Sequence, residues 1–146
     1  MQTRVTKSLV AAATFVLLGS MIGPSSQAGD TVDLAAAAKQ FLNSCGVCHT
    51  VEPNAEIRQG PNLRTVYGRK AGELAEFTTY SDALKAAGGK GLVWSDEALD
   101  KWIDNSAAFI PGAMMPYAQP DAAKRQLVIA YLKSLGAAGG SDPPKP

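Results

Sequence analysis

The sequence predicts an all-α domain whose helices are joined by loops rich in glycine and proline. Three segments of the 146-residue chain carry apolar residues at helical spacing, and no segment of useful length alternates apolar and polar residues as a strand would. Breakers such as Gly60-Pro61 and Pro111-Gly112 lie between the helical segments. A composition of 46% hydrophobic and 18% charged residues suits one compact domain.

The first helix is expected over residues 32–45, where apolar residues recur at helical spacing from Leu34 onward and Thr31 precedes them as an N-cap. A shorter helix is expected over residues 82–87, ahead of the pair Gly88-Gly89, because glycine favours a helix end.

Two further helices are expected in the C-terminal half. One covers residues 96–105, with Ser95 as its cap and acidic residues in its first turn. The other covers residues 122–135, with Asp121 as its cap and Gly136 as its end. Both carry an apolar stripe on one face.

Residues 1–28 are expected to be a cleaved signal peptide. Arg4 and Lys7 form a positive start, residues 9–22 are an apolar run without charge, and the small residues at the end suit cleavage after Ala28. The alternative is an uncleaved membrane anchor, but the run is shorter than the roughly 20 residues of a spanning helix. We therefore expect a periplasmic protein without a membrane span after cleavage.

The remaining chain is expected to form one domain over residues 29–136 and a flexible tail over residues 137–146. Loss of Arg4 and Lys7 lowers the number of basic side chains from 14 to 12, against 13 acidic ones, so the net charge changes from +1 to about −1. This balance argues against nucleic acid as a partner, which would require a strongly basic surface.

The motif that carries chemistry is Cys45-Gly46-Val47-Cys48-His49. The pattern Cys-x-x-Cys-His is the signature of covalent haem attachment. One tight turn lets the two thiols reach the two vinyl groups of one porphyrin, and the imidazole then lies under the iron. The motif predicts one covalent haem c with His49 as a ligand of its iron.

Other sites share parts of this motif. A thioredoxin-like redox pair would lie near a βαβ pattern, which is missing from the sequence. A structural zinc ion needs four ligands, and two cysteines with one histidine would require an acidic fourth. A disulfide between Cys45 and Cys48 would close a very short loop and stabilise the fold little. Haem explains the motif better than these alternatives.

The sixth iron ligand is left open by these residues. His49 is the only histidine, so the ligand is a methionine, another weak donor, water or nothing. Met1 and Met21 leave with the signal peptide, which leaves Met114 and Met115. A methionine sulfur raises the reduction potential, whereas an open position would favour a haem enzyme or a gas sensor.

Several segments outside the motif match the pattern of a known family. They are Phe41, Gly60-Pro61-Asn62-Leu63, Tyr67-Gly68-Arg69-Lys70, Phe77, Tyr80-Ser81-Asp82-Ala83, Pro111-Gly112-Ala113-Met114-Met115 and Ile129-Ala130-Tyr131-Leu132-Lys133. With the haem motif, they resemble mitochondrial cytochrome c and its bacterial relatives, the class I c-type cytochromes. The resemblance covers nearly all of residues 32–135. It implies a class I cytochrome c fold, with helices and loops wrapped around one covalent haem.

The resemblance also implies roles for individual residues. Met115 would be the sulfur ligand, and the carbonyl of Pro61 would accept a hydrogen bond from the other ring nitrogen of His49. Arg69, Tyr80 and Trp94 would hold a haem propionate. Trp102 falls where the family has an aromatic residue near the methionine sulfur.

One departure from the family concerns its surface. Mitochondrial cytochromes c ring the exposed haem edge with lysines, and the corresponding positions here hold Ser44, Ala107, Ala108 and Met114, with Arg58 as an exception. Docking should therefore depend less on charge steering.

The resemblance implies electron transfer between transient redox partners, a donor and an acceptor, by a monomer that is not an enzyme. Two alternatives remain open. One is a haem enzyme or gas sensor with an open sixth site, and the other is a thiol–disulfide oxidoreductase.

Overall fold

The computed structural model describes residues 32–137, so the expected signal peptide and residues 138–146 of the expected tail lie outside it. The described residues form helices and loops, with two isolated antiparallel bridges, Lys70 to Val93 and Asn105 to Ala118, in place of strands. The all-α prediction is confirmed. The helices are α1 (Leu34–Ser44), α2 (Asp82–Gly89), α3 (Asp96–Asp104), α4 (Ser106–Phe109) and α5 (Ala122–Ala137).

Helix α1 begins later than expected, because its N-cap is Asp33 and not Thr31. Asp33 Oδ1 accepts hydrogen bonds from the backbone N–H groups of Ala35 at 2.9 Å and Ala36 at 3.2 Å. A carboxylate satisfies two otherwise unpaired donors at the positive end of the helix dipole, which favours this start. The helix ends at Ser44, one residue before the expected end.

The two expected caps in the C-terminal half are confirmed. Ser95 Oγ accepts from the N–H of Ala98 at 3.2 Å, and Asp121 Oδ1 accepts from the N–H of Ala123 at 2.9 Å. The expected stop at Gly136 is wrong, because α5 continues through it to Ala137.

Helix α2 also runs through the glycines that were expected to end it. A Cβ on Gly88 would lie 2.0 Å from the carbonyl oxygen of Ala71. Gly88 therefore lets α2 pack closely against the loop that contains Ala71, while it remains part of the helix. Helix α4 was not expected, since four residues are too few to show a periodic pattern.

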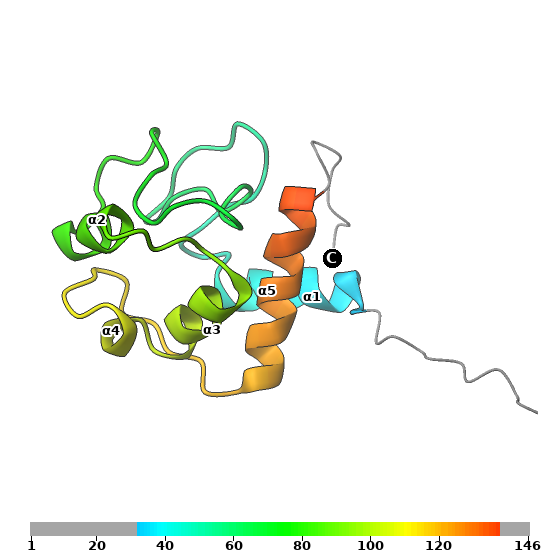
Figure 1. The fold of residues 1–146 in the computed structure, drawn as a ribbon. Helices are drawn as coiled ribbons and strands as arrows, with labels where there is room; N and C mark the ends of the chain where they lie inside the picture. The colour runs from blue at the N-terminus through cyan, green and yellow to red at the C-terminus, as the bar shows by residue number, and fades with distance from the viewer. Residues whose placement is uncertain (1–31, 138–146) are drawn as a thin grey trace, which may run out of the picture.

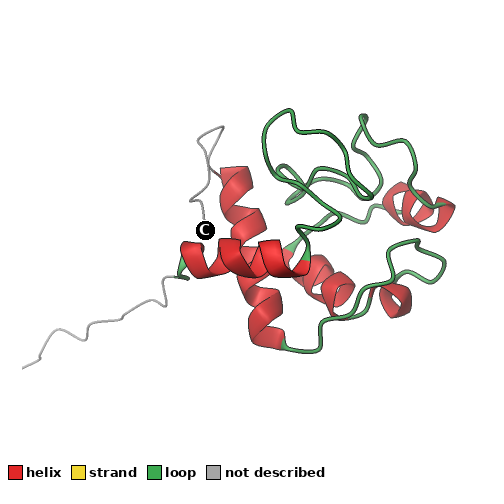
Figure 2. Cartoon of the chain, turned by 180° about the vertical axis from the view of Figure 1, so that it is seen from behind, coloured by secondary structure: helices red, strands yellow, loops and turns green. Residues whose placement is uncertain are grey.

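Helices α1 and α5 cross on one side of the molecule, whereas α2, α3, α4 and the long loops occupy the other side (Figure 1). The view from behind shows the same crossing (Figure 2). Phe41 of α1 and Tyr131 of α5 are both buried there, with ring centroids 5.3 Å apart. The small side chains of Ala37 and Ala38 complete the buried face of α1 and let the helices pack closely.

Helix α3 packs against α5, and an ion-pair cluster fastens the two together. Arg125 Nε lies 2.8 Å from Asp100 Oδ1, and Arg125 Nη1 lies 3.0 Å from Asp104 Oδ1. The α1–α5–α3 assembly is thus the frame that carries the loops. Within residues 32–137, no helix is both long and apolar enough to cross a bilayer.

Candidate functional site

A cavity of about 570 Å³ lies between the helical frame and the loops. Its size falls within the range of roughly 300–1,000 Å³ typical of cofactor and ligand pockets. Its wall includes all nine residues singled out in the sequence: Cys45, Cys48, His49, Pro61, Arg69, Tyr80, Trp94, Trp102 and Met115. Residues spread over 71 positions of the chain, from 45 to 115, therefore meet around one space.

The cysteines reach this cavity because the chain turns at the end of α1. The N–H of Cys45 donates to the carbonyl of Phe41 at 2.7 Å, and the next turn brings the N–H of His49 within 2.9 Å of the carbonyl of Cys45. This tight turn places Cys45 and Cys48 on the same wall, both as free cysteines. Burial, with a smaller effect of Cys48, raises the pKa of the Cys45 thiol to about 12. A redox-active thiol needs a lowered pKa, so this environment does not favour thiol–disulfide exchange.

His49 is held by the loop that follows the motif. Its side chain is buried, and Nδ1 lies 2.8 Å from the carbonyl oxygen of Pro61. A carbonyl only accepts, so Nδ1 carries the proton and Nε2 keeps a free lone pair for a metal. Burial lowers the pKa of His49 and the bond to Pro61 partly opposes that shift, so the imidazole is neutral, as metal binding requires.

The loop around Pro61 is itself fastened to the motif. The N–H of Gly60 donates to the carbonyl of Cys48 at 2.9 Å, and the N–H of Leu63 donates to the carbonyl of Thr50 at 2.8 Å. A Cβ on Gly60 would lie 2.2 Å from Cε1 of His49. Glycine is therefore required here by the close approach of the imidazole to the backbone.

The two methionines of the 111–116 loop differ in their surroundings. Met115 is partly buried and packs against the hydrophobic core, whereas the side chain of Met114 is 69% exposed at the rim of the cavity. A thioether that faces the interior of an apolar cavity can act as a soft metal ligand. Of the two sulfurs, that of Met115 is the better placed to do so.

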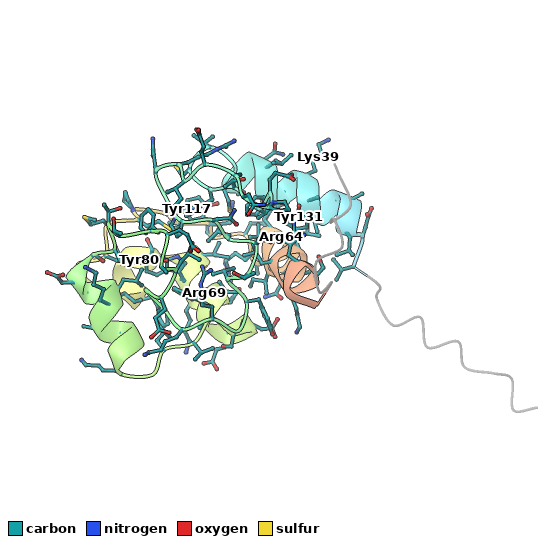
Figure 3. The ribbon with its side chains drawn as sticks, turned by 90° about the horizontal axis from the view of Figure 1, so that it is seen from above. Lys39, Arg64, Arg69, Tyr80, Tyr117 and Tyr131 are labelled. Atoms are coloured by element: carbon teal, nitrogen blue, oxygen red, sulfur yellow. The ribbon has the colours of Figure 1, made fainter. Side chains whose placement is uncertain are left out.

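Aromatic and cationic side chains complete the wall. Trp94 and Trp102 are buried, with ring centroids 5.4 Å apart. Arg69 and Tyr80 lie on loop segments close to α2 (Figure 3). Arg69 Nη1 donates to Thr65 Oγ1 at 3.1 Å, and burial lowers the pKa of its guanidinium while Tyr80 raises it. Burial raises the pKa of Tyr80, and Arg69 opposes that shift, so a neutral hydroxyl and a guanidinium face the cavity together.

The arrangement fits a haem c. Two thiols on one turn can form the thioether links, one neutral imidazole and one thioether can bind the iron, and the wall is otherwise largely apolar. Arg69 and Tyr80 supply polar hydrogens for a carboxylate.

The sequence model of the cytochrome c family matches residues 34–136. The chain belongs to the cytochrome c family. A cytochrome c2 of Afifella marina is 40% identical over 114 residues, which cover 76% of this chain and 90% of that protein. A cytochrome c2 of Blastochloris viridis is 34% identical over 125 residues, which cover 85% of this chain and 95% of the relative. The solved structure of cytochrome c2 from Rhodospirillum centenum superposes with a TM-score of 0.66 at 32% identity, covering 70% and 98% of the two chains.

As a member of the cytochrome c family, the chain has the class I fold, carries one covalent haem c and transfers electrons. The resemblance noted in the sequence is thus confirmed.

The sequence reasoning missed part of the cavity wall. Tyr117 lines the cavity two residues beyond Met115. Phe77 matched the family pattern without a role, and it lines the cavity with its ring centroid 4.7 Å from that of Tyr80, in an edge-on arrangement. Leu99 and Leu132 also line the cavity, from α3 and α5. The apolar stripes of these helices indicated burial, but they gave no sign that the buried face lines a cofactor site.

Uncharged residues are exposed in the haem motif, in α4 and in the 111–116 loop. Val47 and Met114 are 79% and 69% exposed, and Ala107 and Ala108 are exposed as well. Arg58, the basic exception, donates to the backbone carbonyl of Gly46 within the haem motif.

Proposed function

We propose that this member of the cytochrome c family is a periplasmic electron carrier whose iron ligands are His49 and Met115. The haem c supplies the one-electron couple. The chain holds both ligands in place, keeps water from the cavity and presents an edge of the site to transient donor and acceptor proteins. It is proposed to act as a monomer and to make or break no substrate bond.

The observation that carries this proposal is the contrast between the two methionines. Met115 is partly buried and packs against the core beside the cavity, whereas Met114 is 69% exposed. A ligand that is fixed by packing needs little movement when the oxidation state changes, and this favours fast electron transfer. Such an arrangement serves a carrier better than an enzyme, which would need an open coordination site.

The other wall residues have proposed roles that follow from their chemistry. Arg69, Tyr80 and Trp94 can each donate a hydrogen bond to a haem propionate. The carbonyl of Pro61 fixes the tautomer of His49 and strengthens it as a ligand. Trp102 packs beside Trp94 and helps to exclude water from the methionine side of the cavity.

A matched pair of variants tests the ligand assignment. We expect Met115→Ala to lower the reduction potential, to abolish the near-infrared thioether-to-ferric charge-transfer band and to let the ferrous protein bind carbon monoxide. Met114→Ala should leave all three properties close to those of the wild type, because Met114 is largely exposed. Swapped results would assign the ligand to Met114. Carbon monoxide binding by the wild type, without the band, would support the open-site alternative of a haem enzyme or gas sensor.

The proposed location has its own test. The N-terminal sequence of the protein isolated from periplasm should begin at Gly29, after cleavage behind Ala28. An intact N-terminus in a membrane fraction would support the anchor alternative.

A further inference from the structure

Ser106 is a fully buried polar side chain whose presence packing does not explain. It is the first residue of α4, directly after the cap Asn105, and its exposed fraction is 0%. It lies outside the cavity wall. A hydroxyl loses its hydration on burial and is disfavoured there unless it is hydrogen-bonded. An alanine would fill nearly the same volume without that penalty, so the hydroxyl needs another reason.

All hydrogen bonds of this hydroxyl go to the segment that contains Met115. Ser106 Oγ accepts from the N–H of Tyr117 at 3.1 Å. It lies within donor distance of the carbonyl of Met115 and, at 3.1 Å, of the carbonyl of Tyr117. One hydroxyl has one proton, so it donates to one of the two carbonyls while it accepts from the N–H of Tyr117.

The backbone of Ser106 adds a further link to the same segment. Its N–H donates to the carbonyl of Tyr117 at 3.1 Å. One residue later in the segment, Asn105 and Ala118 form an isolated antiparallel bridge, and the N–H of Gln119 donates to the carbonyl of Ile103 at 2.9 Å. The stretch after Met115 is thus fastened along the junction of α3 and α4. Within residues 32–137, the hydroxyl of Ser106 is the side-chain group that reaches both Met115 and Tyr117.

We propose that Ser106 is a positioning residue that latches the 115–117 segment and thereby controls how often the sulfur of Met115 leaves the iron. This inference rests on the proposed ligation by Met115. The side chain of Met115 is partly buried and packs against the core, which restricts rotation about its own bonds. We infer that release of the sulfur therefore moves the backbone of Met115 as well and lengthens the Ser106 bonds. The latch acts through the backbone, so Ser106 itself touches neither the iron nor a partner protein.

The test compares the ferric holoproteins of the wild type, Ser106→Ala and Ser106→Thr. The measured quantity is the rate at which saturating imidazole replaces the sixth ligand, followed by visible absorbance, because this rate is limited by departure of the sulfur. Loss of a buried hydroxyl that serves several partners should raise the rate about tenfold. Hydrogen exchange at the amide of Tyr117 should accelerate in parallel. Ser106→Thr, which keeps a hydroxyl, should return both rates toward those of the wild type.

Ser95→Ala is the matched control. It removes a serine hydroxyl that accepts from the N–H of Ala98 at the start of α3, away from the methionine segment. It should lower the denaturation midpoint without changing the imidazole rate. If Ser106→Ala and Ser95→Ala lower the midpoint alike and neither changes the imidazole rate, Ser106 is merely structural and the inference is overturned.

The ligand assignment and the latch fail in different ways. Absence of the thioether charge-transfer band from the wild type would refute ligation by Met115, and the latch with it. A band that is present in the wild type, with an unchanged imidazole rate in Ser106→Ala, would refute the latch alone.

If Ser106→Ala does not accumulate as holoprotein, hydrogen exchange in the wild type tests the proposal instead. Saturation with imidazole should then accelerate exchange at the amide of Tyr117, since displacement of the sulfur opens the latch. Unchanged protection of that amide would overturn the proposal.

Discussion

Replacement of Gly60 by alanine should displace the ring of His49 and weaken the haem site. The new Cβ would lie 2.2 Å from Cε1, 2.6 Å from Nδ1 and 2.8 Å from Nε2 of that ring. Carbon atoms in contact lie about 3.5–4.0 Å apart, so the ring must retreat by about 1 Å or more. Nδ1 is 2.8 Å from the carbonyl of Pro61, and a shift of that size takes the pair beyond hydrogen-bonding range.

Two effects set the size of the loss. Overpacking of a tight site costs about 1–3 kcal/mol, and the lost hydrogen bond contributes about 1 kcal/mol more. The free energy of unfolding of Gly60→Ala should therefore fall by about 2–4 kcal/mol. Guanidinium denaturation of the ferric holoprotein, followed by tryptophan fluorescence and by haem absorbance, measures this change.

Gly89→Ala is the control for the effect of adding a methyl group at a glycine. No heavy atom lies within 4 Å of a Cβ built on Gly89, which sits in α2. This substitution should be neutral or should stabilise by up to about 1 kcal/mol, because alanine is the better helix former. If Gly60→Ala were as stable as Gly89→Ala, with an unaltered visible spectrum, the backbone near His49 would be free to move and the reasoning would fail.

Three further predictions concern charge. Hydrogen bonds from Lys133 and from Tyr67 lower the pKa of Asp96. The stability gained from its carboxylate is therefore present above the unfolded pKa and is lost as the pH falls through the lower folded pKa. The difference in free energy of unfolding between the wild type and Asp96→Asn should be full above about pH 5 and shrink below about pH 4; a constant difference would contradict this. Arg125→Ala should lower the denaturation midpoint more than Lys101→Ala, because the Arg125 side chain is 11% exposed and that of Lys101 is 56% exposed. Electron transfer with a purified redox partner protein should vary less than about threefold between low and physiological ionic strength, because the exposed Met114 at the rim is uncharged; a steep fall with salt would refute this.

The parts of the fold that local chemistry determines could be predicted from the sequence. Ser95 and Asp121 cap the helices predicted to follow them. A short polar side chain before an amphipathic segment accepts hydrogen bonds from the free N–H groups of the first turn. The Cys-x-x-Cys-His motif identified one wall of the site, since its spacing alone suits the cofactor.

Helix ends were harder to predict, because tertiary contacts override local preference. Gly88 would end an isolated helix, yet it continues α2 because its missing side chain lets the carbonyl of Ala71 approach. Gly136 differs from Gly88, because a Cβ there would meet Tyr67 only at an ordinary 3.9 Å; it is the last residue but one of α5, where helix ends commonly vary by one or two residues. At the start of α1, the sequence predicts Thr31 as the N-cap, whereas Asp33 has that role. Both residue types are good caps, and only the backbone hydrogen bonds of the folded helix distinguish them.

The role of Ser106 lay beyond the reach of sequence reasoning for a different reason. Its partners Met115 and Tyr117 are nine and eleven positions away, across a loop broken by Pro111-Gly112. No periodic pattern relates residues across such a loop. A serine after Asn105 gives no sign of burial until the loop has folded back over it.

The cavity also explains why the site and the core of this protein are difficult to separate. The haem site is a space of about 570 Å³ in the middle of a small domain, and apolar side chains that lose their packing partners destabilise a fold. Trp94, Trp102 and Leu99 belong to the core cluster and to the cavity wall at once. The cofactor therefore stands where other domains of this size place large side chains, and substitutions that loosen its ligands should also loosen the fold.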